Sequence, residues 1–223
     1  MTFNFDNSKY LLPDSLKDIT LYTRLEYERM YGRDLDAQNI EISKMPESNE
    51  KDVEKFLWLA DSACKTLSFF SGIDLERLKT SAEVRQIMNV YTANLSVLLE
   101  EEGTLNIEPY YLFKGEQWVI VPPAEEVTSE EMSYKQFKLT KSIILDLVSL
   151  GDGNWDKLPT LCALYLRKKD ETTDQVLSVL DERRELMLEL PLDIALTVGI
   201  YLKDTMALFI RSLKDFKPEE VEQ

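Results

Sequence analysis

The chain has 223 residues, enough for one large domain or two small ones, and its 41 acidic residues against 26 basic ones give a formal net charge of −15 at pH 7. Such a surface repels the phosphates of nucleic acids and of anionic membranes, and it favours basic partners. The absence of histidine removes the usual general base at neutral pH and the commonest transition-metal ligand. The composition therefore predicts a protein that binds neither nucleic acid nor membrane and that holds no metal.

The N-terminal segment, residues 1–18, is polar and is expected to be an extended arm that docks through Tyr10, Leu11 and Leu12. It has no basic region followed by an apolar segment, so we expect no signal peptide. No apolar run in the chain approaches the roughly 18 residues that a membrane-spanning helix needs. We therefore expect a soluble intracellular protein.

Two further patterns follow the arm. Thr20 has the position of an N-cap, and the helix that it opens is expected to end at Gly32. The short alternation of Ile40 and Ile42 within residues 33–49 is interpreted as an edge strand followed by a loop.

A long helix is expected over residues 50–71, with Gly72 as its C-terminal glycine. Its apolar residues recur at helical spacing and predict one buried face, made of Val53, Phe56, Leu57, Ala60, Cys64, Leu67 and Phe70. Asp74 then caps a short helix, and Thr80 with Glu83 is expected to form the capping box of the next helix.

Residues 104–123 carry the strongest strand signal. Two runs of aromatic and β-branched residues flank a short turn that contains Gly115, and this pattern predicts a β-hairpin. Tyr111 and Trp118 have two alternative roles: packing on the helices through one face of the hairpin, or anchoring a partner on the other face, since Tyr and Trp are enriched at interfaces. We name these two residues as the candidate partner-binding residues.

The remainder of the chain is expected to be helical. Ser133 with Gln136 has the pattern of a capping box at the start of a helix over residues 133–149. Pro159 suits the first turn of a further helix that reaches Arg167.

The last two helices are separated by Pro191, and the first of them is opened by Thr172 with Gln175, another capping box. Residues 217–223 are expected to form a flexible acidic tail.

No motif of catalytic or cofactor chemistry is present. Only seven glycines occur, and they form neither a phosphate-binding loop nor a nucleophile elbow. Residues 152–156 alternate oxygen-bearing side chains as a calcium loop does, but Lys157 and Ala163 stand where such a loop needs Gly at its sixth and Glu at its twelfth position. Cys64 and Cys162 lie in apolar helical patterns, as core thiols do in a reducing compartment. We therefore predict no catalytic, cofactor-binding or metal-binding residue, and a protein that is not an enzyme.

Several short motifs follow one another along most of the chain. They are residues 12–21 (LPDSLKDITL), 69–74 (FFSGID), 113–115 (FKG), 132–137 (MSYKQF) and 159–165 (PTLCALY), with a late helix after Leu190 and Pro191. In this order they resemble a family of proteins that tailed bacteriophages encode for virion and tail assembly, and within it the tail assembly chaperone-like members. The resemblance implies an acidic helical protein that acts around the tape-measure protein and has no catalytic residues.

Pattern and resemblance together predict one mainly α domain over residues 1–223, a helical bundle-like domain with one small β-hairpin insertion. They predict a non-enzymatic protein-binding protein of phage particle assembly: a tail assembly chaperone or a virion-associated structural component, in the host cytoplasm or in the virion. Its partners would be other phage assembly or virion proteins with a basic or amphipathic surface, and self-association is left open. The alternative is an acidic mimic of nucleic acid that inhibits a DNA-binding protein, which the net charge favours and the mixing of acids with bases along the chain disfavours.

Overall fold

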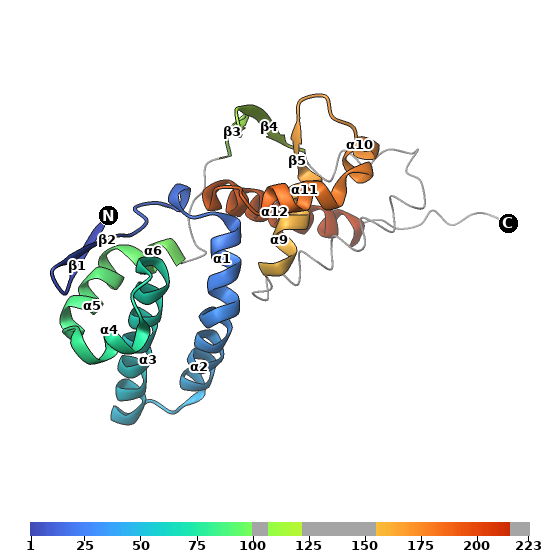
Figure 1. The fold of residues 1–223 in the computed structure, drawn as a ribbon. Coiled ribbons are helices and arrows are strands. Elements are labelled where there is room, and N and C mark those ends of the chain that lie inside the picture. The colour runs from blue at the N-terminus through green and yellow to red at the C-terminus, as the bar shows by residue number, and fades with distance from the viewer. Residues whose placement is uncertain (100–106, 122–154, 215–223) are drawn as a thin grey trace. The chain divides into compact units, whose positions relative to one another are not determined.

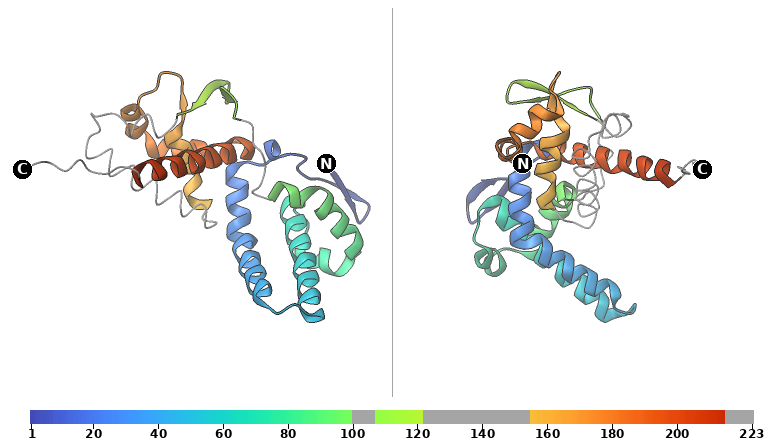
Figure 2. Two further views of the ribbon diagram at one scale, coloured as in Figure 1. Left: turned by 180° about the vertical axis from the view of Figure 1, so that it is seen from behind. Right: turned by 90° about the vertical axis from the view of Figure 1, so that its right-hand side faces the viewer.

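The computed structural model of the chain describes residues 1–99, 107–121 and 155–214 (Figures 1 and 2). Its fold is mainly α with small antiparallel β elements, as the sequence predicts. We expected a single domain over residues 1–223, whereas the contacts within the chain divide it into two compact units, Met1–Gly103 and Thr104–Gln223. Each unit is therefore described by itself.

The first unit is helical apart from an N-terminal hairpin. Its elements are β1 (Thr2–Phe5), β2 (Ser8–Leu11), a short 3₁₀ helix (Leu16–Asp18), α1 (Leu21–Tyr27), α2 (Arg33–Lys44), α3 (Asn49–Ser71), α4 (Leu75–Ser81), α5 (Val84–Val90) and α6 (Ser96–Leu99). Two π-helical segments, Glu28–Gly32 and Tyr91–Leu95, join α1 to α2 and α5 to α6 without a break in the helix.

The N-terminal segment is a β-hairpin rather than the extended arm that we expected. β1 and β2 pair antiparallel, and the two-residue turn between them is Asp6-Asn7, with φ of 47° and 61°. Such turns need positive φ at both positions, which Asp and Asn tolerate better than most residues, and they match the twist of the flanking strands. The turn residues could have revealed this hairpin, but its strands are too short for their alternation to show.

The hairpin docks through β1 and through two of the three residues that we named, Leu12 and the partly buried Tyr10. Phe3 and Phe5 alternate onto one face and are buried, with exposed fractions of 2% and 5%. Of the predicted contacts only Leu12 is buried, while Leu11 is 79% exposed and Tyr10 is half-buried. The alternation of the strand therefore decides which side chains reach the core.

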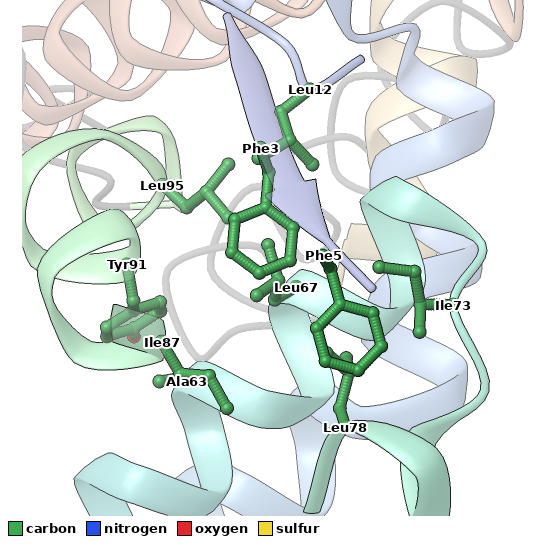
Figure 3. Close-up of a cluster of buried hydrophobic side chains, with 10 residues drawn as sticks. All are labelled: Phe3, Phe5, Leu12, Ala63, Leu67, Ile73, Leu78, Ile87, Tyr91 and Leu95. Carbon is green, nitrogen blue, oxygen red and sulfur yellow. The ribbon is translucent and has the colours of Figure 1, made fainter. Parts of the chain in front are cut away.

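These side chains complete the core of the first unit, which Figure 3 shows. The cluster brings together residues from the hairpin, α3, α4 and the α5 to α6 run: Phe3, Phe5, Leu12, Ala63, Leu67, Ile73, Leu78, Ile87, Tyr91 and Leu95. The contributions from α3 come from its C-terminal half only.

Thr20 caps α1 as predicted, and its hydroxyl accepts a hydrogen bond from the Thr23 N–H at 3.1 Å. The predicted end of this helix at Gly32 is wrong, because Gly32 keeps helical backbone angles and the chain runs on through a π turn into α2. The edge strand predicted at Ile40 and Ile42 is wrong for the same reason, since both residues lie in α2.

Helix α3 ends as predicted at Gly72, which has the left-handed φ of 71° that favours glycine. Asp74 caps α4 as predicted and accepts from the Arg77 N–H. The capping box predicted at Thr80 and Glu83 is wrong: the Thr80 hydroxyl donates to a carbonyl within α4, and Glu83 itself is the N-cap of α5, without a side-chain cap bond.

The second unit combines a small sheet with four helices in its described part. Its elements are β3 (Tyr111–Phe113), β4 (Glu116–Ile120), a short 3₁₀ helix (Trp155–Lys157), α9 (Leu158–Tyr165), β5 (Leu166–Lys168), α10 (Thr173–Ser178), α11 (Leu180–Met187) and α12 (Leu192–Lys214). The predicted β-hairpin is confirmed as β3 and β4, joined by Lys114-Gly115 with φ of 49° and 77°. The capping box of Thr172 with Gln175 is also confirmed.

A third strand, β5, was not expected. The helix predicted to reach Arg167 ends at Tyr165, and the next three residues pair antiparallel with β4, with Trp118 opposite Lys168. The capping box predicted at Ser133 and the acidic tail 217–223 lie outside the described residues. None of the helices in the described part of the chain has the length and apolarity that crossing a membrane requires.

Candidate functional site

The two residues named from sequence lie in the core of the second unit. The two-residue turn puts Tyr111 opposite Trp118, so both side chains share one face of the hairpin. Their exposed fractions are 8% and 1%. The large apolar side chains of residues 110–120 that are exposed are instead those of Tyr110 and Leu112, at 47% and 67%. The burial of Tyr111 and Trp118 gives no support to the prediction that these two residues anchor a partner.

The Trp118 ring contacts a cationic side chain of its own unit. The Arg183 guanidinium lies 4.8 Å from the centre of its ring, a distance typical of cation–π contact. Arg183 is itself buried; it forms a 2.6 Å ion pair with Glu171 and donates to the Leu166 carbonyl at 2.7 Å. Burial alone would raise the pKa of Glu171, but the hydrogen bonds from Arg183 and from the Lys168 N–H outweigh it, so the pKa is lowered. This network ties β4, β5 and α11 together.

The surface that best fits a binding role lies in the first unit, on the antiparallel pair of α2 and α3 (Figure 1). The end of this helical hairpin extends beyond the other elements of its own unit in each view (Figure 2). Lys51 closes the end: its Nζ donates to the carbonyls of Ser43 and Met45 at 3.2 and 2.9 Å and pairs with Glu47 at 2.6 Å. Lys51 is only 6% exposed, so these oxygens compensate a nearly buried charge.

Trp58 joins the two helices nearer to the core. Its indole N–H donates to the Leu35 carbonyl at 2.9 Å, across 23 residues of sequence. With Lys51 at one end and Trp58 in the middle, the hairpin is fixed by polar contacts that replace part of the apolar packing.

The N-terminal half of α3 exposes apolar side chains that we predicted to be buried. Val53, Phe56 and Leu57 lie three and four residues apart, so they share one side of the helix, and each is more than half exposed, at 54–56%. We call them the α3 apolar strip. Ile40 of α2 is exposed to a similar degree. The prediction of one continuous buried face holds only for the C-terminal half of α3, because none of the elements described for residues 1–99 covers the other half.

A groove of about 770 Å³ runs between α2 and α3 beside this strip, and we call it the hairpin groove. Its apolar lining includes Ile42, Met45, Leu57 and Trp58. Leu57 therefore belongs both to the α3 apolar strip and to the groove. The groove is large enough to receive several side chains of a partner, and Leu57 is the point at which it meets the strip.

The rim of the hairpin groove is acidic, with Glu41, Glu50, Glu54 and Asp61 among its lining residues. Asp61 pairs with two lysines of its own unit; burial would raise its pKa, but these pairs together lower it, so it stays ionised. Glu50 and Glu54 have no cation within ion-pair distance among the residues that the structure describes, and their negative charge faces the groove uncompensated. This arrangement favours a positively charged occupant.

A second cavity, of about 510 Å³, shares Trp58 with the groove, and we call it the π-turn pocket. It contains the Arg24–Glu28 ion pair, 2.6 Å long and 7% exposed on each side. Tyr27 also lines it, with its hydroxyl 2.8 Å from the Thr66 hydroxyl, and burial raises the pKa of Tyr27 to about 12. Ser62 lines the same cavity and is 2% exposed, and its Oγ has no hydrogen-bond partner among the described residues.

Both π-helical segments of the first unit line this pocket, through Glu28 and Gly32 of one and Tyr91 of the other. Single π turns inside α-helices are rare and often mark functional sites. A Cβ at Gly32 would overlap the Glu28 carboxylate, so a larger residue at this position would require the Glu28 side chain to move. Gly32 was the one sequence signal for the pocket, and we interpreted it as a helix end.

Comparison with models of protein families, with curated proteins and with solved structures found no match. Within residues 1–99, 107–121 and 155–214, cysteine and acidic side chains form no group of three or more that could hold a metal ion.

Proposed function

We propose that this chain is a non-enzymatic protein-binding protein whose hairpin groove and α3 apolar strip receive a basic, amphipathic segment of another protein. One observation carries the proposal: three large apolar side chains, Val53, Phe56 and Leu57, are more than half exposed on one side of a helix. Leaving them in water forgoes about 1.5–3 kcal/mol for each side chain that could be buried. An exposed and continuous apolar surface of this kind is typical of an interaction site.

Charge identifies the partner's chemistry. Glu50 and Glu54 face the groove, and the whole chain carries −15. A segment with apolar side chains on one side and lysine or arginine on the other would bury the first in the groove and pair the second with the rim. Such a helix-in-groove mode uses side chains three and four residues apart, the spacing that the α3 apolar strip itself has.

The resemblance to tail assembly proteins of bacteriophages supports placing this activity in phage particle assembly. The partner would then be another assembly or virion protein, and the chain would act as a tail assembly chaperone or as a structural component of the particle. An exposed apolar groove suits a chaperone, because it can cover an apolar segment of a partner until that segment is packed elsewhere.

Site-specific photo-crosslinking in phage-infected cells tests the proposal. A photoreactive amino acid replaces Phe56 in the α3 apolar strip, and a matched control places it at Tyr22, which is 50% exposed on α1. We expect position 56, and not position 22, to crosslink to one phage assembly or virion protein at the stoichiometry of a complex.

Three outcomes contradict the proposal. Crosslinks that are equal from both positions indicate non-specific contact. Crosslinks to a host DNA-binding protein would favour the nucleic-acid mimic instead. No crosslink from position 56, with the chain correctly folded, removes the α3 apolar strip as part of the binding surface and contradicts the proposal.

A further inference from the structure

We infer that the π-turn pocket binds the cationic head of one basic side chain, a guanidinium or a primary ammonium, from the segment that occupies the hairpin groove. The inference rests on the proposed function for the source of the side chain and on the pocket itself for its chemistry. Within residues 1–99, Trp58 is the one residue that lines both the π-turn pocket and the hairpin groove. A partner's side chain in the pocket would therefore pass beside the Trp58 ring.

The charges of the pocket favour a cation. Among the described residues its charged lining consists of the Arg24 guanidinium and the carboxylates of Glu28 and Asp36, so the formal sum is one minus two, or −1. Arg24 and Glu28 pair with each other at 2.6 Å. Asp36 lies at the exposed mouth and supplies the remaining charge. An anion would meet two carboxylates beside one guanidinium, whereas a cation balances the remaining negative charge.

The walls of the pocket also suit a cation. Three aromatic rings line it, those of Tyr27, Trp58 and Tyr91. The Arg24 guanidinium already lies 5.8 Å from the centre of the Tyr27 ring, within the range of cation–π attraction. The other two rings offer the same attraction to a ligand, and Trp is the strongest partner of this kind.

The pocket also supplies hydrogen-bond acceptors for a cation. A guanidinium has five N–H donors and no acceptor, so its site must supply oxygens. The pocket offers the carboxylate of Asp36 and the amide oxygen of Asn39, both exposed residues, and the hydroxyl of the buried Ser62. Ser62 is nearly fully buried and has no hydrogen-bond partner among the residues that the structure describes, so its hydroxyl can accept from a donor of the ligand.

Fluorine NMR of the full chain labelled with fluorotryptophan tests the inference directly. The chain has three tryptophans, and two of them, Trp118 and Trp155, are buried in the second unit and serve as internal references. The probe is butylguanidinium, and its neutral isostere butylurea is the control ligand. We expect butylguanidinium to shift the Trp58 signal alone, with saturation at millimolar concentration, and butylurea to have no effect.

Matched variants locate the bound cation. Asp36→Asn should weaken butylguanidinium binding about three- to five-fold, the usual range for losing one partly exposed charge pair. Asp34→Asn, two residues away on the exposed side of α2, should leave binding unchanged. Because Asp36 is exposed, the variant is expected to fold, and an unchanged melting temperature would verify this.

Several outcomes overturn the inference. A Trp58 signal that does not move, or that moves equally with butylurea, excludes a cation site. Loss of the response in Glu54→Gln with retention in Asp36→Asn places the cation in the hairpin groove, which overturns the inference and leaves the proposed function intact. A normal response to butylguanidinium, combined with no crosslink from position 56, contradicts the proposed function and leaves the pocket's chemistry standing.

Discussion

Gly32 and Glu28 face each other across a π turn so closely that any side chain at position 32 would overlap the Glu28 carboxylate. Glycine inside a helix normally costs about 0.5–1 kcal/mol relative to alanine. Here the missing side chain makes room for the carboxylate that pairs with Arg24 at 2.6 Å, in a buried position. The glycine therefore serves the π-turn pocket at the expense of helix propensity.

Gly32→Ala should for this reason destabilise the first unit, by about 1–3 kcal/mol, the usual cost of overpacking a filled site. The sign is diagnostic, because the same change at an unconstrained helical glycine would stabilise the protein. Urea denaturation followed by circular dichroism measures the difference in the free energy of unfolding.

A double-mutant cycle provides the control. In a Glu28→Ala background the obstructing carboxylate is gone, so Gly32→Ala should become neutral or stabilising, and the two changes should not be additive. Equal effects of Gly32→Ala in both backgrounds would show that its cost does not come from Glu28.

Trp118→Ala should destabilise the second unit by about 3–5 kcal/mol, since it removes a large buried ring and leaves the Arg183 guanidinium without its aromatic contact. Leu112→Ala, on the exposed side of the same hairpin, should change stability by no more than about 0.5 kcal/mol. Thermal unfolding of both variants compares them. Similar melting temperatures for the two would contradict the placement of Trp118 in the core.

The Glu171–Arg183 pair should make stability depend on acidity. The folded-state pKa of Glu171 is lowered from its ordinary value of 4.5. The stabilisation is therefore fully present above that value and is lost as the pH falls toward and through the lowered folded-state pKa. The difference in unfolding free energy between the wild type and Glu171→Gln should be constant near neutrality and should shrink below pH 4.5. A difference that grows on acidification would contradict this assignment.

Lys51→Met should loosen the end of the α2–α3 hairpin, because the carbonyls of Ser43 and Met45 lose their donor. We expect a loss of about 1–3 kcal/mol, the cost of leaving buried polar groups without partners. Lys55→Met, one turn further along α3 and exposed, is the matched control. Hydrogen exchange should be faster around residues 43–51 in the first variant only, and unchanged protection there would show that the salt-bridged lysine does not hold the hairpin closed.

The sequence predicted helix ends correctly where a single capping residue determines them. Thr20, Gly72, Asp74 and Thr172 each act through a backbone group within three or four residues, so their spacing in the sequence was sufficient. The fold class and the β3–β4 hairpin followed from patterns of the same range.

The candidate site could not be predicted in this way, because it depends on whether other elements of the fold cover the N-terminal half of α3. Val53, Phe56 and Leu57 have the same spacing as the buried residues of the second half of that helix, and they differ only in that no element within residues 1–99 covers them. Gly32 was misinterpreted as a helix end. The Glu28 carboxylate occupies the space where a Cβ at position 32 would lie, and this arrangement depends on a π turn that sequence periodicity does not reveal. The role of Trp118 could not be decided from the sequence either. The two-residue turn sets the register of the hairpin, and this register places the Trp118 side chain in the core.

The central claim is that the α3 apolar strip binds a basic amphipathic segment, and a peptide titration tests it most directly. The ligand is a helical peptide with one leucine face and one lysine–arginine face, and isothermal titration compares the wild type with Phe56→Ser and Leu57→Ser. We predict at least ten-fold weaker binding to each variant, about 1.4 kcal/mol or more, with melting temperatures nearly unchanged because both side chains are exposed. Equal affinity for all three proteins, or equally tight binding of a peptide with glutamate in place of lysine and arginine, would contradict the account.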